Sequence, residues 1–185
     1  MKLSGPMGRL SRPILDRVKE SLFNILATRY SMPEGKVVAD LFCGVGSLGL
    51  EALSRGAKFV TFVDKDFETL AILRQNIAKA GYTGQSKVTV ADAFREGAAV
   101  NPDIGRYELV FVDPPYAMMN DVGEKSLLSG LMNTLAEQTV RGAVVVVRIP
   151  CKTKLLERYG RFAAIDRRQW GTMAITFFSR KDDDK

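Results

Sequence analysis

The feature that most constrains this chain is the stretch from Val37 to Gly49, in which an apolar run is followed by closely spaced glycines. Residues 37–42 are β-branched and apolar enough to form a buried parallel strand. Gly44 and Gly46 would let the backbone turn sharply and approach a ligand that a Cβ would keep away, and a helical pattern begins at Leu48. This order predicts an open α/β sheet with a ligand site above the carboxyl end of the strand.

An acidic residue at this turn narrows the choice of ligand. Glycine spacing of this kind also occurs in dinucleotide dehydrogenases, where the helix N-terminus holds a pyrophosphate. Asp40 stands four residues before Gly44. Its carboxylate would repel a pyrophosphate but suits the ammonium of S-adenosylmethionine, directly or through water. The turn therefore favours a methyltransferase, and a dinucleotide oxidoreductase stays open as the alternative.

Composition excludes several classes of protein. The chain has 185 residues, of which 46% are hydrophobic, as expected for one globular domain. No apolar run approaches the ~20 residues of a membrane span, and residues 1–15 lack a signal-peptide core, so we expect a cytoplasmic protein without membrane contact. Histidine is absent and the two cysteines, Cys43 and Cys151, have no zinc spacing, which argues against a metal enzyme. The net charge of +6 fits either a nucleic-acid partner or a merely basic surface.

Two further predicted strands also end in acids. Residues 59–63 run into Asp64 and Lys65, and residues 88–90 are followed by Asp92 and Ala93. The second strand should lie beside the first, so its terminal acid suits the ribose hydroxyls of a bound nucleoside. The acid after the third strand suits the adenine amino group, with Ala93 or its neighbour Phe94 flanking the ring. Either acid alone could instead cap a helix.

The most informative tetrapeptide is Asp113-Pro114-Pro115-Tyr116, which follows a predicted strand at residues 107–112. The two prolines fix φ and remove two N–H donors, which leaves carbonyls beside an acid and an aromatic ring. We expect Asp113 and the Pro114 carbonyl to accept the hydrogens of an amine on a planar ring on which Tyr116 stacks. A nucleobase would have to be unpaired or flipped out to reach them. The alternative is a structural Pro-Pro turn.

The remaining pattern divides the chain into an arm, one domain and a tail. Residues 1–11 form a basic arm, residues 12–180 the domain, and residues 181–185 a polar tail that resembles an expression-tag remnant. The domain should contain helices at about 13–28, 67–80 and 123–138, and further strands at 143–149, 162–165 and 172–178. The candidate phosphate contacts are Arg9, Arg12, Arg167 and Arg168, the last two in a short connection between strands.

These motifs together resemble the RsmD-like family of bacterial ribosomal RNA guanine-N2 methyltransferases. The resemblance covers about residues 12–180 and is most particular in the Arg12-Pro13 pair and the segment from Asp16 to Leu26. It includes the glycine turn at 40–49, the segment Glu51-Ala52-Leu53-Ser54-Arg55-Gly56-Ala57 and the tetrapeptide at 113–116.

The resemblance implies a doubly wound, mostly parallel α/β sheet of seven strands with one antiparallel strand. It also implies S-adenosylmethionine as donor, with S-adenosylhomocysteine as product, and methylation of the exocyclic N2 amine of a guanine in small-subunit (16S) ribosomal RNA. The expected partner is ribosomal RNA or the small ribosomal subunit, and we expect a monomer. The predicted site residues are Asp113, Pro114 and Tyr116 for catalysis, Asp40, Phe42, Gly44, Gly46, Asp64, Lys65, Asp92 and Ala93 for the cofactor, and Pro115, Arg9, Arg12, Arg167 and Arg168 for the substrate.

Other functions fit part of the pattern. The tetrapeptide also suits an enzyme that methylates adenine-N6 or cytosine-N4 in DNA or in another RNA. Cys151 follows the predicted fifth strand, where some pyrimidine-C5 RNA methyltransferases keep a nucleophile, but no activator stands beside it in the sequence. A cofactor-binding RNA protein without catalysis is a further alternative.

Overall fold

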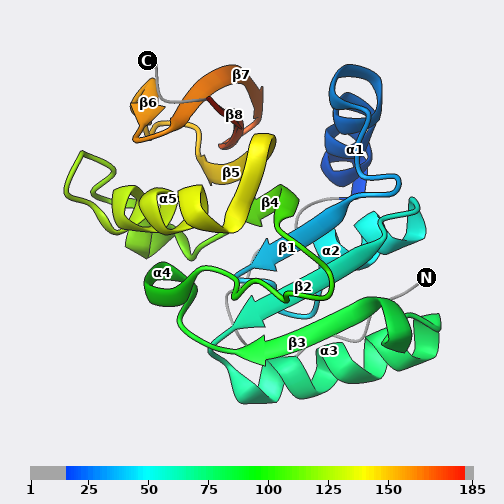
Figure 1. Ribbon diagram of the computed structural model, residues 1–185. Helices are drawn as coiled ribbons and strands as arrows, with labels where there is room; N and C mark the ends of the chain where they lie inside the picture. Colours follow the sequence, from blue (N-terminus) through cyan, green and yellow to red (C-terminus); the bar gives the residue numbers. More distant parts are fainter. Residues whose placement is uncertain (1–15, 182–185) are drawn as a thin grey trace.

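The computed structural model describes residues 16–181, which form one eight-stranded sheet with helices on both faces (Figure 1). The strands are β1 (Val37–Leu41), β2 (Phe59–Asp64), β3 (Ser86–Val90), β4 (Tyr107–Val112), β5 (Thr139–Pro150), β6 (Arg158–Tyr159), β7 (Phe162–Trp170) and β8 (Met173–Arg180). The helices are α1 (Asp16–Tyr30), α2 (Ser47–Ser54), α3 (Phe67–Ala80), α4 (Ala93–Glu96) and α5 (Leu127–Gln138), with 3-10 turns η1 (Thr83–Gln85) and η2 (Tyr116–Met119).

The strand order is β3-β2-β1-β4-β5-β8-β7-β6. Strands β1 to β5 pair in parallel, while β8 runs antiparallel to both β5 and β7. The predicted doubly wound α/β class is therefore confirmed, but the sheet has eight strands rather than seven, and two of them, β8 and β6, rather than one run opposite to β1–β5. The additional strand is β6, a two-residue element that pairs antiparallel with β7. A strand this short leaves no apolar alternation in the sequence, so it could not be predicted.

The core consists of two layers, one on each face of the sheet. Helices α1, α2 and α3 cover the face that carries Val38, Phe62 and Phe111. Helices α4 and α5 cover the opposite face, which carries Val110 and Val145. Because both faces are covered, the central strands are apolar throughout, as parallel strands usually are. The carboxyl ends of β1, β2 and β4 thus lie together between the two layers of helices.

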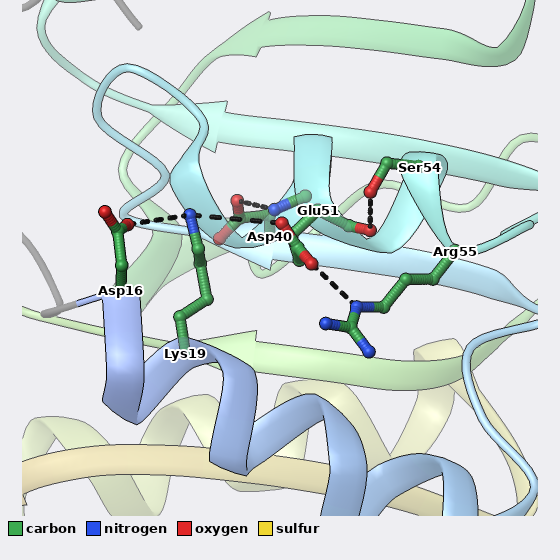
Figure 2. Close-up of polar contacts among 7 residues, drawn as sticks. Asp16, Lys19, Asp40, Glu51, Ser54 and Arg55 are labelled. Carbon is green, nitrogen blue, oxygen red and sulfur yellow. Dashed lines mark hydrogen bonds and ion pairs between the residues drawn. The ribbon is translucent and has the colours of Figure 1, made fainter. Parts of the chain in front are cut away.

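Helix α1 lies over the central strands and is attached to α2. The ring of Phe23 packs on that of Phe111 with centroids 5.6 Å apart. Lys19 reaches Glu51 of α2 at 3.9 Å, and the same carboxylate binds Arg55 at 2.7 Å (Figure 2). These partly exposed ion pairs contribute little stability individually. The pair between Lys19 and Glu51 joins α1 to the C-terminal half of α2.

Several predicted boundaries are wrong, and β5, for example, begins at Thr139 instead of residue 143. The segment around Arg167 and Arg168 is not a connection, because β7 continues to Trp170 and the turn lies at residues 171–172. These polar residues are extended because they pair with Thr176 and Ile175 of β8, a non-local interaction. Helix α5 begins at Leu127 instead of near residue 123, because the Ser126 hydroxyl accepts a hydrogen bond from the Ser129 amide and caps it.

Within residues 16–181, none of the helices combines the length and the apolar character that crossing a membrane requires.

Candidate active site

Three acids gather at the carboxyl edge of the sheet. Asp40 on β1 pairs with Phe111 on β4, and Asp113 follows two residues later. Side chains alternate along a strand, so Asp40 and Asp113 point to the same face, the one covered by α1 and α2. Their carboxylates are close enough that the charges of Asp113 and Asp64 both raise the pKa of Asp40. The ends of β1, β2 and β4 therefore contribute acids to one shared site.

Asp40 is a buried carboxyl, with 1% of the residue exposed. Its Oδ2 atom accepts a hydrogen bond from the Gly49 amide at 2.7 Å, in the first turn of α2 (Figure 2). Burial raises the pKa of Asp40 to about 8, against the lowering effect of the Gly49 hydrogen bond. A cation placed beside this group would favour its charged form.

The glycine turn between β1 and α2 uses three residues with positive φ, namely Phe42 at 59°, Gly44 at 53° and Gly46 at 88°. A Cβ on Gly44 would have no heavy atom within 4 Å, so this backbone borders open space. A Cβ on Gly46 would lie 2.4 Å from Cδ1 of Leu73. The expectation of a close approach to a ligand thus fits Gly44, whereas packing inside the protein constrains Gly46.

This difference predicts that two alanine substitutions separate stability from binding. We expect Gly46→Ala to lower the free energy of unfolding by roughly 2–4 kcal/mol, because it adds a clash to an unfavourable φ. Gly44→Ala should lower the free energy of unfolding by only about 1 kcal/mol, since the left-handed φ is the one unfavourable feature of an alanine at this position. Its methyl group should instead weaken the binding of S-adenosylmethionine. Denaturant unfolding and calorimetry would measure both quantities, and equal unfolding costs for the two variants would contradict the prediction.

Asp64 connects the glycine turn to the end of β2 by hydrogen bonds. Its Oδ2 accepts from the Gly44 amide at 2.9 Å and its Oδ1 accepts from the Asp66 amide at 3.0 Å. Each carboxylate oxygen can accept a further hydrogen bond, so ribose hydroxyls remain compatible with this arrangement. The adjacent Lys65 is exposed.

Asp92 caps the N-terminus of α4, which is the alternative role that the sequence allowed. Its Oδ1 accepts from the Phe94 amide at 3.0 Å at the start of α4. The rings of Phe94 and Phe42 lie 4.7 Å apart between centroids, and Ala93 beside them is buried. The cap leaves Oδ2 of Asp92 with its full accepting capacity next to an apolar wall.

Asp113 is held by Arg148, a residue of β5 that is not among the predicted site residues. The Arg148 Nε donates to Oδ1 of Asp113 at 2.6 Å, with 12% and 18% of the two side chains exposed. Burial raises the pKa of Asp113, and the Arg148 guanidinium opposes this effect. The guanidinium carbon also lies 5.9 Å from the ring centroid of Tyr116. The signal for Arg148 was its position as the single charge in the apolar end of β5, after Val144 to Val147.

The two prolines differ in exposure. Pro114 is buried, whereas Pro115 is exposed and precedes η2, which begins at the half-buried Tyr116. The tetrapeptide therefore borders the site with the Asp113 carboxylate, the buried Pro114 and the Tyr116 ring.

The predicted arginine contacts are not one cluster. Arg167 donates from Nη2 to the Cys151 carbonyl at 2.8 Å. Arg168 binds the Asp166 carboxylate at 3.0 Å. As neighbours on β7 they point to opposite faces of the sheet. Arg9 and Arg12 lie outside the described residues.

In the described part of the chain, the side chains of Cys, Asp and Glu form no group of three suited to a metal ion. Cys43 is buried and Cys151 half-buried, and both are free thiols.

Comparison with curated proteins finds related methyltransferases. The chain is 29% identical over 182 residues to the "Putative rRNA methyltransferase YlbH" of Bacillus subtilis, an alignment that covers 97% of this chain and 93% of that protein. It is 36% identical over 115 residues to the ribosomal RNA small subunit methyltransferase D of Escherichia coli K12. That second alignment covers 62% of this chain and only 54% of the relative.

Solved structures share the fold. The structure of the "Putative methyltransferase yhhF" from Escherichia coli superposes with a TM-score of 0.76 at 26% identity, and the alignment covers 99% of this chain and 93% of that one. An RNA methyltransferase from Salinibacter ruber, in complex with S-adenosyl-L-homocysteine, has a TM-score of 0.67 at 17% identity. The alignment covers 94% of this chain and 96% of that one, and it shows the fold alone.

The model of the family described as Conserved hypothetical protein 95 matches residues 1–179. The chain therefore belongs to this family, and it is an RsmD-like methyltransferase with a class I fold.

Proposed function

We propose that this protein transfers a methyl group from S-adenosylmethionine to the exocyclic N2 amine of a guanine in small-subunit ribosomal RNA. The observation that carries the proposal is the placement of Asp113, held by Arg148, on the same face as the buried Asp40. The names of the relatives support ribosomal RNA as the substrate. The choice of guanine-N2 rests on the resemblance of the motifs, and we propose that the protein acts as a monomer.

The residues around the glycine turn fit the cofactor. Asp40 is a buried acid whose pKa of about 8 would fall if an ammonium lay nearby. Asp64 can accept from ribose hydroxyls, and the rings of Phe42 and Phe94 with the free oxygen of Asp92 suit adenine. S-adenosylmethionine, when bound, supplies a methyl group that its sulfonium already activates.

The protein's own part in the reaction is to orient the amine. Asp113 and the Pro114 carbonyl accept the two amine hydrogens, which draws the nitrogen lone pair out of conjugation with the ring and toward the methyl group. Tyr116 stacks on the base, and Arg148 fixes the Asp113 carboxylate. Positioning of this kind supplies several kcal/mol of the barrier. As the N–C bond forms, the bond between the methyl group and the sulfur breaks and S-adenosylhomocysteine is left. One amine proton then goes to Asp113 or to water.

A second candidate is methylation of adenine-N6 or cytosine-N4. The tetrapeptide favours it equally, because those amines also carry two hydrogens on a planar ring. The identity of the methylated nucleoside in the product distinguishes the two candidate functions.

The test is the transfer of tritiated methyl groups to ribosomal RNA and small subunits from cells that lack the gene. After digestion to nucleosides, we expect the label in N2-methylguanosine. Label in N6-methyladenosine or N4-methylcytidine would establish the second candidate instead. A folded protein that binds S-adenosylmethionine but labels no nucleic acid would contradict both.

A further inference from the structure

A cavity of about 780 Å³ lies beside β7, on the face of the sheet opposite α1. The segment at 154–158 forms one side and β7 with β8 the other. The residues that line it are Lys154, Leu155, Leu156, Glu157, Arg158, Ala163, Ala164, Ile165, Asp166, Arg167 and Thr176. Its size falls within the range of pockets that hold a small organic ligand.

The charge of the cavity favours an anion. Among the residues that the structure describes, Lys154 and Arg158 form no ion pair, and Arg167 uses one N–H on the Cys151 carbonyl. The Asp166 carboxylate is occupied by Arg29 and Arg168 on the other face of β7. Glu157 is thus the one lining carboxylate in this part of the chain without a described cation partner. Three cations therefore face one uncompensated acid.

The wall of the cavity has features that suit a nucleoside. Leu155 and Leu156 are half-buried and Ile165 is 39% exposed, which provides apolar surface for a flat ring. Thr176 is 3% exposed, and within residues 16–181 its hydroxyl has no hydrogen-bond partner. An apolar surface bordered by cations is the usual composition of a surface that binds single-stranded nucleic acid.

In the strand order, the cavity also lies on the β4 side of the sheet, away from the strands that carry the cofactor acids. The acids assigned to the cofactor, Asp40, Asp64 and Asp92, lie at the carboxyl ends of β1, β2 and β3, whereas the tetrapeptide follows β4. From β4 the order continues with β5, β8 and β7, and in Figure 1 β7 and β8 lie at the opposite end of the molecule from β3. Cys151, whose carbonyl Arg167 binds, stands three residues after Arg148. RNA that presents a base to Asp113 can therefore extend from β4 toward this cavity without crossing the cofactor.

We propose that the cavity holds a nucleotide that flanks the methylated base, with its phosphate on Lys154, Arg158 and Arg167 and its base against Leu155 and Ile165. This inference rests on the proposed function, because it assigns a substrate contact to the same reaction. Phosphate contacts of this kind position RNA and do not read its sequence.

The first test measures binding of a fluorescent small-subunit RNA fragment by anisotropy over a range of salt concentrations. We expect the double variant Lys154→Ala/Arg158→Ala to bind the RNA roughly tenfold or more weakly. The slope of the logarithm of the binding constant against the logarithm of the salt concentration should become less steep by about 0.7 to 0.9 per lost phosphate contact. The control is Lys79→Ala/Lys87→Ala, which removes the same charge from exposed positions on α3 and β3 at the other end of the sheet. It should bind as the wild type does.

A second variant distinguishes the cavity from general surface attraction. Ala164→Trp places a large side chain at an exposed position in the cavity wall without a change of charge. We expect weaker RNA binding with an unchanged salt dependence, while S-adenosylmethionine affinity stays as in the wild type. Wild-type binding by either the double variant or Ala164→Trp would overturn the inference. A wild-type enzyme that methylates no RNA would instead overturn the proposed function.

Discussion

Replacement of Asp113 by asparagine should reduce the rate of methyl transfer by about 10²- to 10³-fold, the usual cost of losing one preorganised polar contact to the reacting group. The amide keeps the size of the side chain, but it loses the charge that attracts the amine hydrogens. Single-turnover transfer of tritiated methyl groups measures the rate. Affinity for S-adenosylmethionine should be unchanged, because the cofactor contacts follow other strands.

The same variant should unfold more easily, since Arg148 would lose the partner of a mostly buried ion pair. The expected cost is about 1–3 kcal/mol, less than for complete removal of a partner because the amide oxygen can still accept from Arg148. The matched control is Asp103→Asn at an exposed position, which should change neither activity nor stability. An Asp113→Asn enzyme with full activity would refute the proposed role.

Arg148→Gln tests whether Arg148 acts through Asp113. The guanidinium lowers the pKa of Asp113, so its removal should raise that pKa further. Activity should then require a higher pH than in the wild type, and the acid limb of the pH-rate profile should move upward. A uniform loss of activity at every pH would indicate a merely structural role.

Most of the fold could be predicted because its signals are local. The strand and glycine turn at residues 37–46 and the helix at 67–80 were found where the structure has them, since an apolar period and a helix-ending glycine suffice to define each. The strand predicted at residues 162–165 is shorter than β7, because Arg167 and Arg168 resemble a polar connection in the sequence. Only pairing with β8 makes them extended, and a single sequence does not contain that information.

The site was predictable in part for the same reason. Acids at the ends of parallel strands must meet at one edge, so Asp40, Asp64 and Asp113 could be grouped without coordinates. The partner of Asp113 could not, because Arg148 is 35 residues away along the chain and comes from another strand. The packing constraint on Gly46 could not be predicted either, since it depends on contact with Leu73 of α3.

Asp40→Asn should make the protein more stable at alkaline pH. The folded pKa of Asp40 is about 8, above its ordinary value of 3.8, so the folded chain holds a proton that the unfolded chain releases between these values. Wild-type stability should therefore fall as pH rises from about 4 to about 8, by a total on the order of a few kcal/mol. Asparagine can keep the hydrogen bond from the Gly49 amide without this cost. Thermal unfolding from pH 5 to pH 9 should show a smaller loss in the variant, and Glu124→Gln, at an exposed position, should follow the wild type.

The same substitution should weaken the binding of S-adenosylmethionine if Asp40 faces its ammonium. An adjacent cation favours the ionised carboxyl, so wild-type affinity should increase as pH rises toward 8, and binding below that pH should release a proton. Asparagine has no charge to offer, so its affinity should be at least tenfold lower at pH 8 and should lose this pH dependence. Calorimetry in buffers of different ionisation enthalpy measures both the affinity and the released proton. Equal affinity and equal proton release in the two proteins would mean that Asp40 only supports the first turn of α2, and the ammonium would then have to bind elsewhere in the turn.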